Sequence, residues 1–393
     1  MKTYFPALTG VRAVAAYMVV LVHLTSLESA ASLPFFKMWV VEYMRQFGIG
    51  VVIFFVLSGF LITTRYAEGI ELRGVWFRRY LQNRFARIYP IYFLLTAFTF
   101  GVMLLRPTHG WWEWAADATG PEKLAAVLLN TTLLRGYFNQ FAVLGLPTAW
   151  SLTVEETFYL CAPLLLLGLR RNLRRVVLYP VALLALGLAL VAFCARILPY
   201  YGLMQDVRFM LGMTFFGRAA EFFWGMALAL WVARQRRLLA RRGRYTLLGA
   251  SGIMLYMAAT ALLGHYCPTC FDRTGVDWYL VETLASSTLL PVFICSLFWG
   301  LISEQTWLRW LLETRLLTLL GKASYALYLL HLGTVDYLFR VYVSNNSLVC
   351  LLAYTLLSIG LYQAVERPLQ KWLRARPLPA RAAAPAATGI ESA

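Results

Sequence analysis

The stretch FGIGVVIFFVLSGFLITTRY, residues 47–66, decides the fold, because it carries no charge before Arg65 and is long enough to cross a bilayer as a helix. Similar runs recur along the 393-residue chain, which is 60% hydrophobic and only 14% charged. A soluble domain of this length needs a far more polar surface. Since backbone groups in lipid must be hydrogen-bonded within their own segment, these runs predict helices.

Ten such runs lie between charged clusters, near residues 7–27, 47–66, 89–105, 150–169, 175–196, 208–233, 245–264, 278–302, 316–340 and 347–366. We therefore predict an all-α fold, a polytopic membrane helical bundle of about ten transmembrane helices. A run near 121–135 is too short to span and is expected to be interfacial or re-entrant. Residues 1–372 form the predicted membrane domain, and residues 373–393, rich in Ala, Pro and Arg, a disordered cytoplasmic tail.

The net charge of +17 indicates orientation in the membrane rather than binding to nucleic acid, because the basic residues gather in short loops. Arginine clusters follow the second, fourth and sixth predicted spans and the last one. All of them fall on one side if both termini are cytoplasmic, which requires an even number of spans.

Two ionisable residues share the first span, and ionisable groups at membrane depth generally mark function. Arg12 and His23 are eleven residues apart, which places them about 20° apart around a helix and about 16 Å apart along it. We expect both to face the same interior. A lipid-anchoring Arg12 and a His23 that merely bonds a neighbouring helix are the open alternative.

The fourth span begins with Glu155 and Glu156, which should lie at about the depth of His23. Neighbouring residues point about 100° apart, so one carboxylate is expected to face the cavity and orient the imidazole. An ion pair with an arginine such as Arg218 is the alternative, although Arg218 and Glu221 could also pair with each other.

Three further features stay open between packing and function. His331, in the ninth span, is typical of a buried packing residue. Ser58-Gly59 in the second span fits a small-residue helix contact or, less simply, a nucleophilic serine. Residues 73–90 predict a separate interfacial helix whose Arg84 and Arg87 bind either anionic lipid or the phosphates of a ligand.

A pair of cysteines, Cys267 and Cys270, lies in a predicted outer loop beside His265. This set is one ligand short of a zinc site, so no metal is expected, and a disulfide is the open alternative.

Taken together, these motifs resemble the acyltransferase-3 family of integral membrane O-acyltransferases, from Leu8 to Leu369. Six blocks carry the resemblance in the family's order: Leu8–His23 with its arginine-x10-histidine spacing, Gly50–Ile62, Arg84–Pro90, Trp150–Leu160, Leu320–His331 and Glu366–Leu369.

The resemblance implies an acyl-CoA-dependent O-acyltransferase. Acyl-CoA, usually acetyl-CoA, would be the donor substrate from the cytoplasm, with no permanently bound cofactor. The acceptor would be a sugar hydroxyl of a cell-surface glycan, a lipid-linked sugar or a secreted glycoside. The location would be the bacterial inner membrane, as a multi-pass protein.

The residue roles follow from the same resemblance. His23 would be the catalytic base, helped by Glu155 or Glu156. Arg12, Arg84 and Arg87 would bind acyl-CoA. Ser58, Arg218 and His331 are the further candidates: a covalent acyl-enzyme on His23 or Ser58 is an alternative to direct transfer.

The sequence departs from the family's pattern at Val52, where many members carry a polar group, at Thr9, and at Gly333, where proline is frequent. Some members carry an added hydrolase-like domain, and this chain is expected to complete transfer alone or with a partner. Two other functions fit intramembrane charges on about ten helices: a secondary transporter, or a non-catalytic export partner for a glycan.

Overall fold

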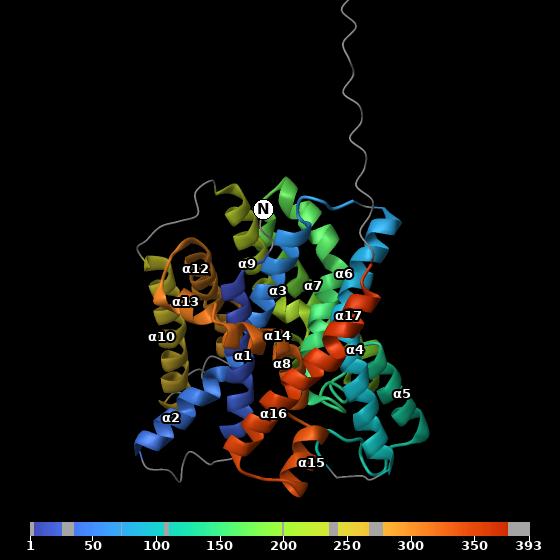
Figure 1. The fold of residues 1–393 in the computed structure, drawn as a ribbon. Helices are drawn as coiled ribbons and strands as arrows, with labels where there is room; N and C mark the ends of the chain where they lie inside the picture. Colours follow the sequence, from blue (N-terminus) through green and yellow to red (C-terminus); the bar gives the residue numbers. More distant parts are fainter. Residues whose placement is uncertain are drawn as a thin grey trace, which may run out of the picture.

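The structure is a computed structural model that describes residues 4–25, 35–71, 73–105, 110–198, 200–235, 243–266 and 278–375. Every regular element in these ranges is helical (Figure 1). The helices are α1 Pro6–Thr25, α2 Phe35–Arg45, α3 Gly50–Tyr66, α4 Gly74–Leu105, α5 Gly120–Thr131, α6 Trp150–Arg171, α7 Arg175–Ile197, α8 Val207–Met213, α9 Phe215–Arg234, α10 Arg244–Tyr266, α11 Trp278–Thr288, α12 Leu290–Ser303, α13 Trp307–Leu312, α14 Arg315–Leu330, α15 Thr334–Tyr342, α16 Ser347–Leu361 and α17 Arg367–Leu373.

Eight helical segments of the described chain are long and apolar enough to cross a membrane, and a bent pair, α14 with α15, makes up to nine. The predicted all-α membrane bundle is confirmed. Helix α9 is not among these segments, because Arg218 and Glu221 make it more polar. Its 20 residues still reach about 30 Å, the thickness of a bilayer core.

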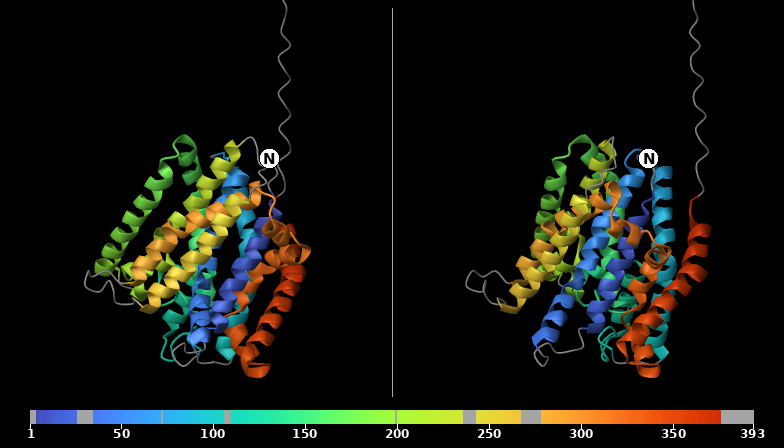
Figure 2. Two further views of the ribbon diagram at one scale, coloured as in Figure 1. Left: turned by 90° about the vertical axis from the view of Figure 1, so that its left-hand side faces the viewer. Right: turned by 60° about the vertical axis from the view of Figure 1, so that its left-hand side comes forward.

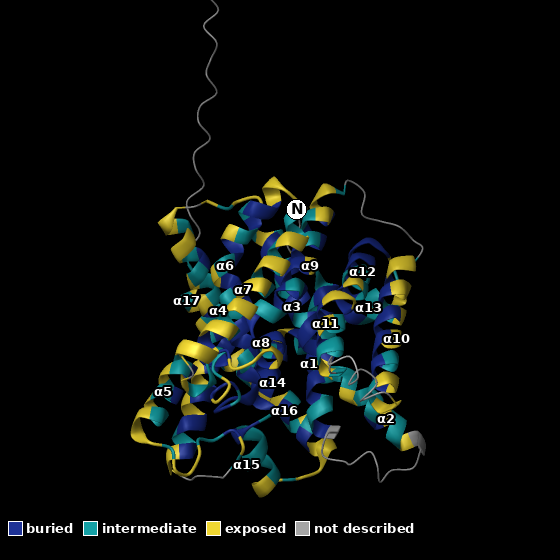
Figure 3. Ribbon diagram, turned by 180° about the vertical axis from the view of Figure 1, so that it is seen from behind, coloured by how far each residue is buried: buried dark blue, intermediate teal, exposed yellow. Residues whose placement is uncertain are grey.

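The bundle is apolar on its outer surface as well as in its centre. Figure 2 shows the long helices running roughly side by side, and Figure 3 shows exposed residues along their outer faces. Many of these are large and apolar, such as Val177, Leu255 and Leu352, which are 65–70% exposed. Contiguous apolar surface of this kind is what lipid covers in a membrane protein.

Helices α3 and α9 pack backbone to backbone in the centre of the bundle. A Cβ atom on Gly59 would lie 2.1 Å from the Phe222 carbonyl oxygen, and one on Gly225 would lie 1.9 Å from that of Val56. Only glycine therefore fits at either position. The prediction of a small-residue contact at Ser58-Gly59 is confirmed for Gly59.

The separate interfacial helix predicted for residues 73–90 is wrong. Helix α4 runs without a break from Gly74 to Leu105, with Pro90 inside it. Its 32 residues extend about 48 Å, more than a bilayer core needs, so its basic first half reaches beyond the core. The proline was an unreliable boundary because neighbouring helices support the α4 backbone there; the Tyr325 hydroxyl, for example, donates to the Ile88 carbonyl oxygen at 2.7 Å.

Two predicted spans are not continuous helices. The run at 208–233 breaks at Thr214, whose backbone is extended, into α8 and α9. The run at 316–340 ends its first helix at Leu330 and turns by 84° into α15. Gly333 lies in this turn with φ +93°, a conformation that favours glycine.

The segment between α4 and α6 packs against the turn between α14 and α15. The Trp112 indole N–H donates to the Thr334 hydroxyl at 3.2 Å, and a Cβ on Gly333 would lie 2.8 Å from Pro147 Cδ. Arg135, fully buried in the same segment, donates to Asn130 Oδ1 and to the Ala142 carbonyl oxygen, each at 2.7 Å. Burial lowers the pKa of Arg135. The turn that carries His331 is thus held from outside the bundle.

The two ends of the described chain meet at one end of the bundle. Tyr4 and Phe5, just before α1, line the same cavity as Gln370 in α17 and Arg374 just after it. This agrees with an even number of crossings. Cys267, Cys270 and the tail beyond residue 375 lie outside the described residues.

Candidate active site

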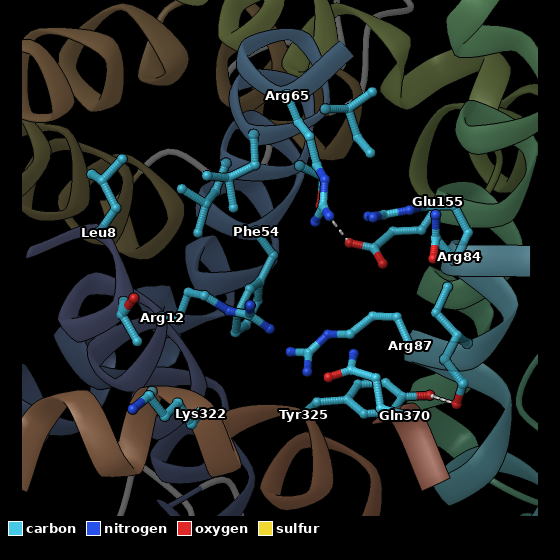
Figure 4. A pocket seen from close by; sticks show the side chains of 18 of the residues that line it. Leu8, Arg12, Phe54, Arg65, Arg84, Arg87, Glu155, Lys322, Tyr325 and Gln370 are labelled. Carbon is cyan, nitrogen blue, oxygen red and sulfur yellow. Dashed lines mark hydrogen bonds between the residues drawn. The ribbon is translucent and has the colours of Figure 1, made fainter. Parts of the chain in front are cut away.

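A cavity of about 390 Å³ lies where α1, α3, α4, α6, α14 and α17 come together (Figure 4). Six cationic side chains of the described chain line it: Arg12, Arg65, Arg84, Arg87, Lys322 and Arg374. Glu155 is the one carboxylate among its described lining residues. Such an excess of positive charge in a confined space favours an anionic ligand.

Two of these arginines come from one face of α4, three residues apart. Arg84 lies against the rings of Tyr66 and Tyr159, each 5.7 Å from its guanidinium carbon, which fixes the planar group by cation–π contact. Arg87 makes an ion pair with the fully buried Glu366. Both arginines line the cavity, and this position favours the binding of a ligand over the binding of anionic lipid.

Glu366 is presented by an irregularity of the last helices. Residues Tyr362–Glu366 form a π-turn between α16 and α17. Such turns insert one residue into a helix and are frequent at functional sites. Here the turn directs Glu366 to Arg87.

Arg12 and Arg374 lie close to other cations of the cavity. Figure 4 shows Arg12 extending from α1 towards the centre of the cavity, and it has no hydrogen-bond or ion-pair partner within the described ranges. Burial, followed by the charges of Arg65, Arg87 and Arg84, lowers the pKa of Arg374, which lies beyond the last membrane-spanning segment. A bound anion would relieve this mutual repulsion.

Glu155 holds a serine at the inner wall of the cavity. The Ser58 hydroxyl donates to Glu155 Oε1 at 2.8 Å, and the Tyr159 hydroxyl donates to Oε2 at 3.2 Å. Glu156 points elsewhere: it is not among the described lining residues, and its Oε2 is buried with no partner in the part of the chain that the structure describes. As expected from their spacing, only one of the two carboxylates faces the cavity.

His23 lies at the far end of α1 from Arg12, against His331. His331 Nε2 is 3.2 Å from His23 Nδ1, although the two residues are 308 positions apart. The expectation that Glu155 or Glu156 orients His23 is wrong, because Glu155 binds Ser58 and Tyr159 while His331 contacts His23. Neither histidine belongs to the described lining of the cavity, so Arg12 and His23 do not share it.

The geometry assigns the tautomers of this histidine pair. His331 Nδ1 faces the Leu327 carbonyl oxygen at 3.2 Å, and a carbonyl oxygen only accepts, so His331 carries its proton on Nδ1. Its Nε2 must then accept from His23 Nδ1–H, which also points at the Val19 carbonyl oxygen at 2.8 Å. A neutral His23 with its proton on Nδ1 is the tautomer whose Nε2 can act as a general base.

Arg218 belongs to a separate buried cluster. Its Nε lies 2.7 Å from Glu221 Oε1, which also accepts from the Ser287 hydroxyl at 3.0 Å. The guanidinium carbon lies 5.5 Å from the centre of the Phe55 ring. The prediction that Arg218 pairs with Glu221 is confirmed, and pairing with Glu155 or Glu156 is not what the structure shows.

Five site residues were not among the sequence candidates: Arg65, Tyr159, Lys322, Glu366 and Arg374. Tyr159, Lys322 and Glu366 lie inside sequence blocks already singled out, and Arg65 is the last residue but one of the stretch quoted first. Their positions in these blocks were a usable signal. Arg374 had no signal apart from its charge.

The chain is similar to known proteins along nearly its whole length. A protein of Staphylococcus aureus (strain COL), named provisionally as an O-acetyltransferase, is 23% identical over 406 residues, covering 94% of this chain and 58% of the relative. The O-acetyltransferase OatA of Staphylococcus aureus (strain NCTC 8325 / PS 47) is 24% identical over 383 residues, covering 94% of this chain and 57% of OatA. The chain thus spans less than three fifths of the length of these relatives.

No solved structure matches the chain. The acyltransferase domain of the acyltransferase-3 family matches residues 5–366, nearly the whole length and every helix that builds the cavity except the last. The chain therefore belongs to the acyltransferase-3 family.

Proposed function

We propose that this protein is a membrane O-acyltransferase that takes an acetyl or other short acyl group from acyl-CoA and transfers it to a sugar hydroxyl. The acceptor would belong to a cell-surface or secreted glycan, its lipid-linked precursor, or a glycoside. The relatives are named as O-acetyltransferases and come from a bacterium, which supports a place in the bacterial cytoplasmic membrane.

The cationic cavity is the observation that carries this proposal. Coenzyme A is a polyanion with a diphosphate and a further phosphate group, and arginine forks match phosphate oxygens. Arg84 and Arg87 on α4 line the cavity together with Arg65 and Arg374. The cavity volume of about 390 Å³ lies within the range of small-molecule sites.

The acyl acceptor would be activated by the histidine pair. Nε2 of His23 would remove the proton from the acceptor hydroxyl, while His331 and the Val19 carbonyl hold the opposite ring nitrogen as N–H. Arg12, which lines the cavity, and His23, which belongs to the histidine pair, are about 16 Å apart along α1. This separation suits a donor and an acceptor that arrive from opposite faces of the membrane.

The test compares one double variant of α4 with a single control variant of the same helix. Arg84→Gln with Arg87→Gln should weaken acetyl-CoA binding by roughly 10²- to 10⁴-fold, since each of the two charge-assisted bonds contributes about 1.5–3 kcal/mol. Arg78→Gln, an exposed arginine of the same helix outside the cavity, should leave affinity unchanged. Titration calorimetry on full-length protein in lipid nanodiscs measures both.

Equal affinity in wild type and the double variant would return these arginines to lipid anchoring. A transporter would move a glycan or glycoside without consuming acyl-CoA, so labelled acetyl from acetyl-CoA appearing in cell-surface glycan separates the two functions. A non-catalytic export partner would show neither acetyl-CoA binding nor loss of function in His23→Ala.

A further inference from the structure

The inner end of the cavity holds a serine bonded to a carboxylate. Ser58 Oγ donates to Glu155 Oε1 at 2.8 Å, and both side chains line the cavity together with Arg12. A hydroxyl held by a neighbouring carboxylate is the arrangement that activates a serine as a nucleophile, because the carboxylate can take its proton. Figure 4 shows the Glu155 carboxylate facing the open space into which Arg12 and Arg87 also point.

An aromatic pair separates this serine from the histidine pair. Phe54 lies one helical turn before Ser58 on α3 and also lines the cavity. Its ring packs edge-to-face against Tyr328 with centroids 6.0 Å apart, and the Tyr328 ring lies 6.0 Å from that of His331. A thioester that enters the cavity therefore meets Ser58 before it can meet His23.

We propose that Ser58 accepts the acyl group from acyl-CoA as a covalent ester, with Glu155 as its base, before the sugar acceptor receives it. This inference rests on the proposed function and adds an acyl-enzyme to it. Two hydroxyls in the cavity donate to Glu155, and that of Ser58 makes the shorter bond, 2.8 Å against 3.2 Å for Tyr159, and belongs to the more nucleophilic aliphatic alcohol.

The first half-reaction is a balanced exchange. Ser58 Oγ attacks the thioester carbonyl carbon while Glu155 takes the hydroxyl proton. The carbon–sulfur bond then breaks, and the departing thiolate takes that proton from Glu155 and leaves as free coenzyme A. Arg12 supplies a cation in the same cavity for the tetrahedral oxyanion.

The second half-reaction moves the acyl group onward. Once the Phe54–Tyr328 pair shifts, the acceptor hydroxyl loses its proton to His23 Nε2 and attacks the ester carbonyl on Ser58. The Ser58–acyl bond breaks, Ser58 Oγ takes a proton from water in the cavity, and the proton held by His23 is released to water on the acceptor side, so that protons balance. No oxidant or further reactant is needed, and coenzyme A itself never has to pass the aromatic pair.

The experiment traps the ester by stopping the second half. Full-length His23→Ala in nanodiscs is incubated with acetyl-CoA labelled in its acetyl group, denatured and digested. We expect stable label approaching one acetyl per chain, located by mass spectrometry at Ser58. The double variant His23→Ala, Ser58→Ala should carry none, and adding Glu155→Gln to His23→Ala should slow labelling by on the order of 10²- to 10⁴-fold.

Two control variants separate chemistry from packing. His23→Ala with Tyr159→Phe removes the other hydroxyl bonded to Glu155 and should still be labelled at Ser58. His23→Ala with Ser58→Cys keeps the size of the side chain at residue 58 and should carry the label as a thioester at the same position. Label found on Tyr159 instead would overturn the assignment.

Failure of this inference differs from failure of the proposed function. If Ser58→Ala transfers acetyl at the wild-type rate and His23→Ala carries no label, transfer is direct and the Ser58 ester is excluded, while the acyltransferase function stands. If wild-type protein neither binds acetyl-CoA nor transfers its acetyl group, the function itself is wrong.

Discussion

His331 shows how much a single side chain can add to a catalytic candidate. Alone on an apolar helix it is typical of packing, and its burial fits that view. Its ring nitrogens, however, connect the Leu327 carbonyl to His23, and this chain of bonds allows one tautomer of His23. We interpret His331 as a positioning residue for the proposed base.

Replacing His331 should therefore slow transfer without harming donor binding. His331→Leu removes the acceptor for His23 Nδ1–H, and we expect the rate of acetyl transfer to fall roughly 10- to 100-fold with the KM for acetyl-CoA unchanged. His331→Gln offers a carbonyl oxygen and should recover part of the rate. The measurement is transfer per mole of folded protein in the membrane.

A purely structural His331 would give a different pattern. Both variants would then lose protein in proportion to activity, and the remaining molecules would turn over at the wild-type rate. A wild-type rate per folded molecule in His331→Leu would contradict the positioning role.

The same residues show what a single sequence can predict. The spacing of Glu155 and Glu156 was sufficient to predict that only one faces the cavity, because helical geometry is local. The contacts of His23 with His331 and of Ser58 with Glu155 join residues 308 and 97 positions apart. No local pattern encodes which distant helix lies alongside, so these partners were not predictable.

At the scale of elements, the turn between α14 and α15 carries the greatest local constraint. Gly333→Ala would place a Cβ in a left-handed backbone region and 2.8 Å from Pro147 Cδ. At φ +93° and ψ −144°, a region that essentially only glycine adopts, we expect a cost of about 1–3 kcal/mol from the backbone conformation alone and a lower melting temperature in detergent. Since this turn carries His331, transfer should fall as well.

Gly360→Ala is the matched control for that substitution. Gly360 lies in α16 with ordinary helical geometry and open space around its Cβ position. Alanine should be neutral or stabilising by up to about 1 kcal/mol at this position. Equal melting temperatures for the two variants would show that the α14–α15 turn is not strained by a side chain at residue 333.

Element boundaries were predictable where charge and hydropathy change together, as at the ends of α6 and α7. They were not predictable at Pro90, which lies inside α4, or at Thr214, where the chain bends without a break in apolar character. In both cases the neighbouring helices, not the local residues, decide the backbone. This is the tertiary influence that propensities cannot contain.

At the scale of the whole molecule, the arginine clusters predict the orientation in the membrane. In a cysteine-free background, a cysteine replacing Arg171, at the end of α6, should react only with reagents that enter the cytoplasm. A cysteine replacing the exposed Asp117 should react from outside the cell. Labelling of intact cells with a membrane-impermeant maleimide distinguishes the two.

External labelling at residue 171 would reverse the orientation and place the cationic cavity on the outer face, where acyl-CoA is absent. The bundle itself would remain as described, because the packing of its helices does not depend on its orientation in the membrane. Composition and apolar runs were sufficient to predict that bundle, while the order in which helices neighbour one another was not.

The pairing of the first helix with late ones has a consequence for biogenesis. A Cβ on Gly321 would lie 1.9 Å from the Thr9 carbonyl oxygen, so α1 and α14 touch at the backbone. During synthesis α1 leaves the ribosome first, while α14 emerges some 300 residues later. Until then α1 stays in the bilayer or beside the translocon, and Arg12 and His23 lack the neighbours that α14 supplies. Any truncated product that stops before α14 is therefore an inserted but unassembled protein, and a natural substrate for membrane quality-control proteases.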